Sequence, residues 1–275
     1  WSPEFWPHSW QRRCVRLLIK FSSRMRIFLK TEDEIQFLRT ASHIASCALS
    51  EVGRNVVPLS SVGYLKAKAT DIVVQLVSSK TQSIRNEQSF HIDLSFFLNG
   101  TYNDDFAGYS TLSKGDLLSV NCSTCYKGYY SFAASTFIVG GILDDHPFLT
   151  WVRDGLIRAQ AKAVAGHPIS EISHAFLSAM QEDTFNLCDC IGHGIGRYKQ
   201  EFPIMRLSSA LSGRRLLKEG MTLVIAPTIM STTVRSRCST MNHDDGHHNS
   251  FVPFGSTVVV RTGRSEILTS LETLS

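Results

Sequence analysis

The sequence lacks any long uninterrupted run of apolar residues. Its longest apolar runs, such as residues 223–226 and 258–260, fall far short of the ~20 residues that span a bilayer. We therefore expect no membrane-spanning helix. The sequence also lacks a G-x-S-x-G nucleophile motif and a glycine-rich phosphate-binding loop, so it gives no support to serine-hydrolase or P-loop chemistry.

The sequence contains few cysteines, and their spacing does not suggest a set of disulfide bonds. The seven cysteines are odd in number and scattered, which favours a reducing compartment over a disulfide framework. Cys122-x-x-Cys125 and Cys188-x-Cys190 could together supply four thiolates to zinc, but alternate side chains on a strand diverge. The polar cluster from His243 to His248 is more typical of a solvated hairpin tip than of a metal site.

Acidic residues are almost absent from the amino-terminal end. Residues 1–30 hold seven of the 28 Lys and Arg residues and one of the 24 Asp and Glu residues, a net charge of +6. The remaining 21 basic and 23 acidic residues give −2, so the overall charge of +4 arises from this end. We expect a basic, Trp-rich arm over residues 1–25 and a single domain over residues 26–275.

Apolar residues make up 43% of the chain, enough for a core. Helical spacing of apolar residues predicts helices over residues 31–52, 60–78, 144–165 and 170–180. Strand patterns occupy residues 92–98, 117–125, 129–139, 221–226 and 256–260. The predicted order is two helices, three strands and two helices, followed by strands and loops from residue 188.

The most unusual stretch is CIGHGIGR at residues 190–197, where three glycines surround His193. The glycines permit sharp bending and close approach of the imidazole to a neighbour. The motif lacks the spacing of a dinucleotide-binding loop. Taken alone, it also suits a glycine-rich turn with a packed histidine.

Five landmarks stand in one order: KTEDEIQFLRTAS at 30–42, STFIVGG at 135–141, CIGHGIGR at 190–197, LLKEGMTLVIAP at 216–227 and GRSEILTSL at 263–271. With these motifs, residues 26–271 resemble type I methionine aminopeptidases of the pita-bread family, peptidase family M24. The resemblance implies an α+β fold, with a curved antiparallel sheet flanked by two pairs of helices. It also implies a dinuclear metal site held by two Asp, two Glu and one His.

The resemblance places His193 at the histidine ligand but puts other residue types at the four carboxylate positions: Asn121, Phe132, Ala226 and Gly255. Gln200 replaces a substrate-facing histidine, and a second such histidine aligns loosely near Gln88. Without carboxylates to bridge two cations, no hydroxide is generated at neutral pH. We therefore expect no metal, no cofactor and no catalytic residue, and predict a pseudoenzyme.

The leading functional hypothesis is a binding module that is a stable part of a larger complex. Methionine aminopeptidases act on nascent chains, and degenerate relatives associate with ribosomes, so the resemblance implies a ribosome component or assembly factor. We expect contacts with ribosomal RNA and with ribosomal or assembly proteins, not with DNA. The basic and aromatic candidates for these contacts are Trp6, Trp10, Arg12, Arg13, Arg16, Lys20, Arg24 and Arg26.

The arginine-rich, acid-poor start also resembles an organellar presequence, so a mitochondrial location is predicted, with a cytoplasmic one as the alternative. A different functional class remains open: a peptide- or protein-binding module that uses the former substrate cleft away from any ribosome. A third is a residual metallo-aminopeptidase.

Overall fold

The computed structural model describes residues 26–80, 90–102, 111–180, 185–187, 189–207, 215–231 and 250–269. The predicted arm at residues 1–25, Gln88, Cys188 and the cluster at residues 243–248 lie outside the described residues. None of the helices within these ranges combines the length and apolarity needed to cross a membrane.

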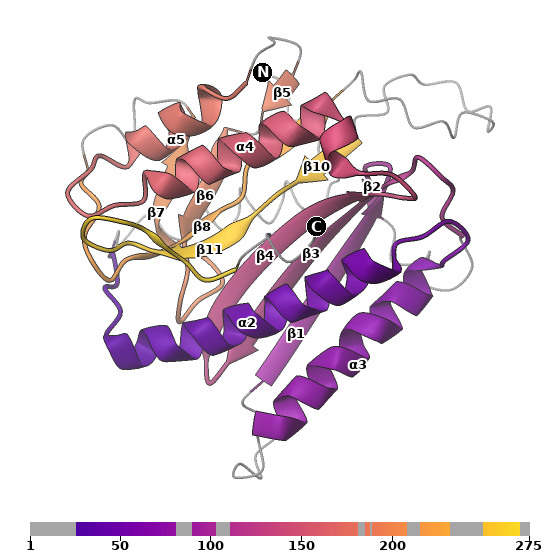
Figure 1. Cartoon of the computed structure of the whole chain (residues 1–275). Coiled ribbons are helices and arrows are strands. Elements are labelled where there is room, and N and C mark those ends of the chain that lie inside the picture. The colour runs from indigo at the N-terminus through magenta and orange to yellow at the C-terminus, as the bar shows by residue number, and fades with distance from the viewer. Residues whose placement is uncertain are drawn as a thin grey trace.

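The first helix pair follows the predicted pattern closely. Helix α2 spans Glu32–Asn55 and begins with a capping box, in which Thr31 and Glu34 bond to each other's backbone nitrogens. Helix α3 spans Val62–Lys80. Figure 1 shows α2 and α3 side by side along one sheet, with α2 packed on strands β3 and β4.

The sheet beneath these helices is antiparallel, in the order β2-β1-β3-β4. Its strands are β1 at Phe90–Leu98, β2 at Thr101–Tyr102, β3 at Leu117–Tyr126 and β4 at Tyr129–Ile138. Lys127 and Gly128, both with positive φ, close the β3–β4 hairpin, as a tight two-residue turn requires. Fully buried Leu118, Val120 and Cys122 pack beneath the apolar stripe of α2.

The second half repeats this arrangement with a different sheet. Its helical elements are η4 at Leu143–Asp145, α4 at Pro147–Ala161 and α5 at Ser170–Leu177. The five-stranded antiparallel sheet has the order β12-β11-β8-β6-β7, with β6 at Cys190–Gly194, β7 at Glu201–Arg206, β8 at Thr222–Ile225, β11 at Ser256–Val259 and β12 at Glu266–Ile267. A small third sheet joins β5 at Phe185–Leu187, β9 at Thr228–Ser231 and β10 at Ser250–Pro253.

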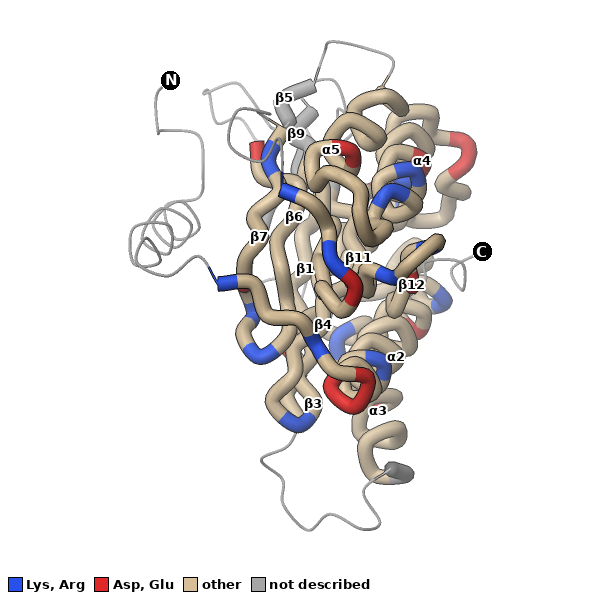
Figure 2. The backbone as a smooth tube through the Cα atoms, turned by 90° about the vertical axis from the view of Figure 1, so that its left-hand side faces the viewer, with Lys and Arg blue, Asp and Glu red and all other residues tan. Residues whose placement is uncertain are grey.

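One backbone contact joins the two large sheets. Ala134 on β4 and Gly255, just before β11, exchange two backbone hydrogen bonds of 2.9 and 3.0 Å. The strands of both halves therefore continue into one another, and Figure 2 shows the helices on one side of them. This arrangement confirms the predicted fold class, a curved antiparallel sheet flanked by two pairs of helices.

The third predicted helix differs most from the observed one, at both of its ends. The predicted helix 144–165 is instead a short 3-10 turn at Leu143–Asp145 followed by α4 from Pro147 to Ala161. Proline lacks an N–H, so it is favoured at the first helical position and ends the turn before it.

Candidate functional site

Three of the five positions that the resemblance aligns with metal ligands lie close together where the two sheets join: Phe132, Ala226 and Gly255. We call the set Asn121, Phe132, His193, Ala226 and Gly255 the sheet row. A Cβ atom built on Gly255 would lie 2.9 Å from the Cβ of Ala226 and 2.9 Å from Cε1 of Phe132. These distances are shorter than ordinary van der Waals contact. A side chain at position 255 therefore requires Phe132 or Ala226 to move.

Asn121 and His193 stand on strands to either side of this contact. Asn121 on β3 is in register with Ala134, which pairs with Gly255. His193 on β6 is in register with Val224 on β8, the strand that ends just before Ala226. The strand register thus places the members of the sheet row on neighbouring strands. Phe132, His193 and Ala226 are half-buried, so they reach solvent.

The polar atoms of the sheet row are uncharged. Asn121 is 8% exposed, and its Oδ1 atom finds no hydrogen-bond partner within the described part of the chain. The Nδ1 atom of His193 donates to the Gly194 carbonyl oxygen at 2.8 Å, which leaves Nε2 as an acceptor. Burial lowers the pKa of His193, opposed by that hydrogen bond and by the charge of Glu201. The imidazole is therefore neutral at neutral pH.

These residues do not fit a pair of divalent cations. Two adjacent cations need several anionic oxygens to offset their repulsion, whereas the sheet row offers one imidazole and one amide. Across the described ranges, no three His, Cys, Asp or Glu side chains gather closely enough to hold a metal ion. Cys122 and Cys125 are buried and Cys190 is half-buried.

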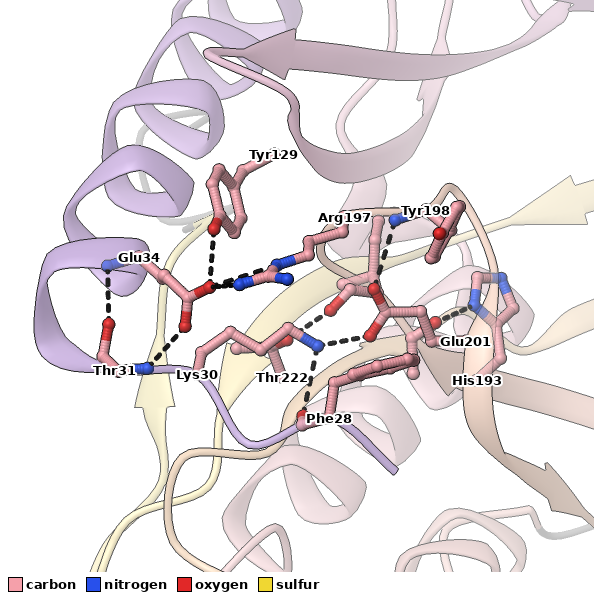
Figure 3. A network of polar contacts seen from close by, with 12 residues as sticks. Phe28, Lys30, Thr31, Glu34, Tyr129, His193, Arg197, Tyr198, Glu201 and Thr222 are labelled. Atoms are coloured by element: carbon pink, nitrogen blue, oxygen red, sulfur yellow. Dashed lines mark hydrogen bonds and ion pairs between the residues drawn. The ribbon is translucent and has the colours of Figure 1, made fainter. Parts of the chain in front are cut away.

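The charged groups lie instead in the loop after His193, where the chain segment before α2 packs against it (Figure 3). Lys30 and Glu201 form an ion pair whose side chains are 2% and 1% exposed. Lys30 Nζ also donates to the Phe28 carbonyl oxygen at 3.2 Å, and Glu201 accepts from the Tyr198 backbone nitrogen at 3.1 Å. Burial lowers the pKa of Lys30, while Glu201 opposes this shift.

A second ion pair closes the same loop over the start of α2. Arg197 donates to Glu34 at 2.5 and 3.2 Å, and the Tyr129 hydroxyl donates to the same carboxylate oxygen at 2.6 Å. Burial would raise the pKa of Glu34, but hydrogen bonds from Tyr129, the Thr31 backbone and Arg197 lower it to about 2. We call Lys30, Glu34, Tyr129, Arg197 and Glu201 the loop network.

Lys30 and Glu201 were not among the residues that the sequence singled out. The strand EFPIMR alternates in burial, with Glu201 on the same buried face as Pro203 and Met205. A carboxylate on the apolar face of an alternating strand predicts a buried partner. That pattern was the available signal, although it does not identify Lys30 as the partner.

The remaining predicted residues separate into two groups. Gln200 is half-buried within the loop network's segment, between Arg197 and Glu201. Arg26 is exposed at the beginning of the described chain, and the next residue, Ile27, forms a β-bridge with Phe202. Trp6, Trp10 and the other basic candidates of the arm lie outside the described residues.

Comparison with known proteins decides the family, because residues 36–262 match metallopeptidase family M24. The chain belongs to this family. It is 27% identical over 253 residues to a methionine aminopeptidase of Clostridium perfringens, covering 90% of this chain and 100% of that protein. It is also 27% identical over 206 residues to methionine aminopeptidase 1 of Bacillus subtilis, covering 74% of this chain and 82% of the relative.

A solved structure gives the same fold. The crystal structure of a methionine aminopeptidase from Thermotoga maritima superposes with a TM-score of 0.68 at 24% identity, covering 89% of this M24 chain and 100% of the other. This likeness, together with the family match, supports the methionine aminopeptidase-like architecture predicted from the landmarks.

The comparisons contradict the prediction that the chain is not an enzyme. The relatives that align with 90% and 74% of it are named methionine aminopeptidases, which are enzymes, and nothing in these matches indicates inactivation. The misfit between the sheet row and a pair of divalent cations concerns only what these five residues can bind, and it does not decide whether the chain is an enzyme. Hydrolysis by this chain would need groups other than a metal pair at these five positions.

Proposed function

We propose that this M24 chain works in association with a ribosome and that its amino-terminal arm contacts ribosomal RNA. The observation that carries the proposal is the charge asymmetry: residues 1–25 hold five Lys and Arg residues and one Glu, a net charge of +4, whereas the other 250 residues hold 23 basic and 23 acidic residues and sum to zero. Clustered Lys and Arg side chains bind phosphates by releasing condensed counterions. Trp6 and Trp10 add ring faces on which unpaired bases stack.

The charge distribution of the described domain supports an RNA contact made by the arm and not by the domain. Its Lys and Arg positions are interspersed with Asp and Glu positions (Figure 2). Several of its basic side chains are already paired, among them Lys30 with Glu201 and Arg197 with Glu34. The arm therefore supplies the net positive charge that an RNA contact requires. A mitochondrial ribosome, with ribosomal or assembly proteins as further contacts, is the form of the proposal that the arginine-rich start favours.

The test is cosedimentation of the purified full chain with purified ribosomal subunits over a range of salt concentrations. Replacing Arg12, Arg13 and Arg16 with Glu should abolish binding at low salt, and wild-type binding should weaken steeply as salt rises. The control replaces Lys66, Lys218 and Arg264 with Glu, which makes the same charge change on exposed positions of the domain. Equal binding by the two triple variants would overturn the RNA contact.

A second candidate function is binding of a polypeptide segment at the sheet row. Phe132, His193 and Ala226 reach solvent, and the Asn121 Oδ1 atom is an acceptor without a partner among the described residues. An N–H donor of a bound peptide would satisfy that acceptor. Such binding is independent of the arm and should survive its charge reversal.

A fluorescent methionyl peptide separates these cases when combined with elemental analysis of the same protein sample. Binding without methionine release, unaffected by arm reversal, supports the peptide-binding function. Release of methionine with stoichiometric metal would instead assign to this chain the activity for which its relatives are named. Absence of both binding and release would remove the sheet row as a peptide site.

A further inference from the structure

The sheet row lies on the face of the sheets that is turned away from the helices. On β3, Val120 and Cys122 flank Asn121 and belong to the apolar cluster formed with α2 and α3. Successive side chains of a strand point to opposite faces, so Asn121 points to the inner face. Phe132 does the same, because its neighbour Ala133 belongs to that apolar cluster. A ligand of the sheet row therefore approaches from the inner face.

Two contacts of β4 bound the inner face around Asn121. Near the start of β4, the backbone nitrogen of Tyr130 donates to the Gly196 carbonyl oxygen at 2.7 Å, which ties the loop after β6 to this strand. Near its end, the Thr136 hydroxyl donates to the Pro253 carbonyl oxygen at 3.0 Å. The inner face is thus bordered by another segment at both ends of the strand. An end of a polypeptide needs one opening there, whereas a continuous segment needs two.

An ion pair adjoins the sheet row on β1. Asp93 also points to the inner face, because it is in register with Ser123, which is in register with Phe132. Its carboxylate accepts a hydrogen bond at 3.5 Å from Lys199, in the loop after β6. The charge of Asp93 is therefore matched within the chain.

The carboxylate that acts on His193 is matched as well. Figure 3 shows Glu201 between His193 and Lys30, with which it forms the buried ion pair. The other Glu201 oxygen accepts from the Tyr198 backbone nitrogen at 3.1 Å. A charged group brought to the sheet row would lose its hydration and find no unpaired counter-charge in these two ion pairs.

The polar atoms that the sheet row offers are uncharged acceptors. Oδ1 of the buried Asn121 has no hydrogen-bond partner in the described ranges. Nε2 of His193 is an acceptor because Nδ1 donates to Gly194. Phe132 and Ala226, both half-buried, add apolar surface. This combination fits a peptide N–H group that carries no charge and is followed by an apolar side chain.

We propose that the sheet row binds the amino end of a polypeptide and prefers an acylated end to a free one. The inference rests on the second candidate function, binding of a polypeptide at the sheet row. A formyl or acetyl group removes the charge of the amino end and leaves one N–H to donate to Asn121. A free α-amino group is mostly protonated at neutral pH, so it brings an unmatched positive charge. A carboxyl end brings an unmatched negative one.

The experiment measures the dissociation constants of two fluorescent peptides for the purified full chain at pH 7. Both peptides have one sequence that begins with methionine and carries the dye at the carboxyl end, and they differ only in an N-formyl group. We expect the formyl peptide to bind at least tenfold more tightly. Equal affinities, or tighter binding of the free peptide, would overturn this inference and leave the second candidate function standing. Failure of both peptides to bind would overturn both.

Asn121→Asp gives the sheet row a carboxylate and should reverse the preference, because the free amine then has a counter-charge. The matched control is Gln36→Glu, the same amide-to-carboxylate change at an exposed position of α2, which should leave the preference unchanged. Thermal unfolding shows whether each variant is folded.

Ser95→Asp keeps the test decisive if Asn121→Asp does not fold. It places a carboxylate at a half-buried position of β1 that is in register with Asn121, and it should shift the preference towards the free peptide. An unchanged preference in the folded carboxylate variants would contradict the proposal. Replacing Arg12, Arg13 and Arg16 with Glu should leave the preference unchanged, which separates this site from the arm.

Discussion

The loop network and the sheet row are linked through β6, because His193 lies on β6 and Arg197 lies in the loop that follows it. The two sets differ in charge. In the loop network, two carboxylates pair with Lys30 and Arg197. In the sheet row, no side chain is charged at neutral pH. Charge buried in this region therefore joins the segment before α2 to the loop after β6. The neighbouring strands β4 and β11 meet through apolar contacts, the backbone pairing of Ala134 with Gly255, and the hydroxyl of Thr257, which hydrogen-bonds to the backbone of Phe132. The difference indicates that the loop network maintains chain geometry.

The largest expected effect on stability comes from removing one partner of the buried ion pair between Lys30 and Glu201. Lys30→Met leaves Glu201 charged, buried and without its cation, which should lower the free energy of unfolding by about 3–5 kcal/mol. Urea unfolding of the purified chain measures this change.

The double variant Lys30→Met, Glu201→Leu is the control. Burial outweighs Glu201 in setting the Lys30 pKa, which is lowered, so desolvation cancels much of the benefit of pairing. Replacing both charges should then restore most of the stability. A double variant no more stable than Lys30→Met would show that the pair acts through its shape or other contacts.

A smaller effect is expected in the sheet row. Gly255→Ala introduces a Cβ atom 2.9 Å from Phe132 Cε1 and from the Ala226 Cβ atom, and such overpacking costs about 1–3 kcal/mol. The same change should cost less in a Phe132→Ala background, where part of the space is free. A double-mutant cycle on unfolding free energies measures the coupling. Strict additivity would contradict the packing described for this row.

A third effect concerns stability at acid pH. The pKa of Glu34 is about 2 in the folded protein, below its ordinary value of 4.5. A carboxylate with a depressed folded pKa stabilises the protein above its unfolded pKa, and this contribution is lost as pH falls from about 4.5 to 2. Glu34→Gln should flatten that part of the stability profile.

Tyr129→Phe provides a graded version of the same test. It removes one hydrogen bond to Glu34, so the folded pKa should rise and less stability should depend on this carboxylate. The decline should accordingly begin and end within a narrower pH interval. Profiles of both variants that coincide with the wild type would show that Glu34 does not contribute to acid sensitivity.

Much of the fold could be predicted because its signals are local. The helical spacing and the Thr31 and Glu34 capping pattern identify α2, and the Lys127-Gly128 turn identifies the β3–β4 hairpin. The positions of the sheet row came from a resemblance and not from spacing. Their packing depends on the contact between Ala134 and Gly255, which lie on strands far apart in sequence.

The features that escaped prediction depend on tertiary structure. Lys30 and Glu201 are 171 positions apart, and no local pattern identifies one as the partner of the other. The positive φ of Leu59 also had no signal, since a Val-Pro-Leu-Ser sequence permits several turn types. That backbone is fixed by hydrogen bonds to and from Leu112, more than fifty residues later.

The central functional claim is that this M24 chain works on a ribosome through its basic arm. The most direct measurement follows the native protein through a density gradient of gently lysed cells at low salt. The account predicts that the protein sediments with a ribosomal subunit and moves to the light fractions as salt is raised. Sedimentation free of ribosomal subunits at low salt would contradict it.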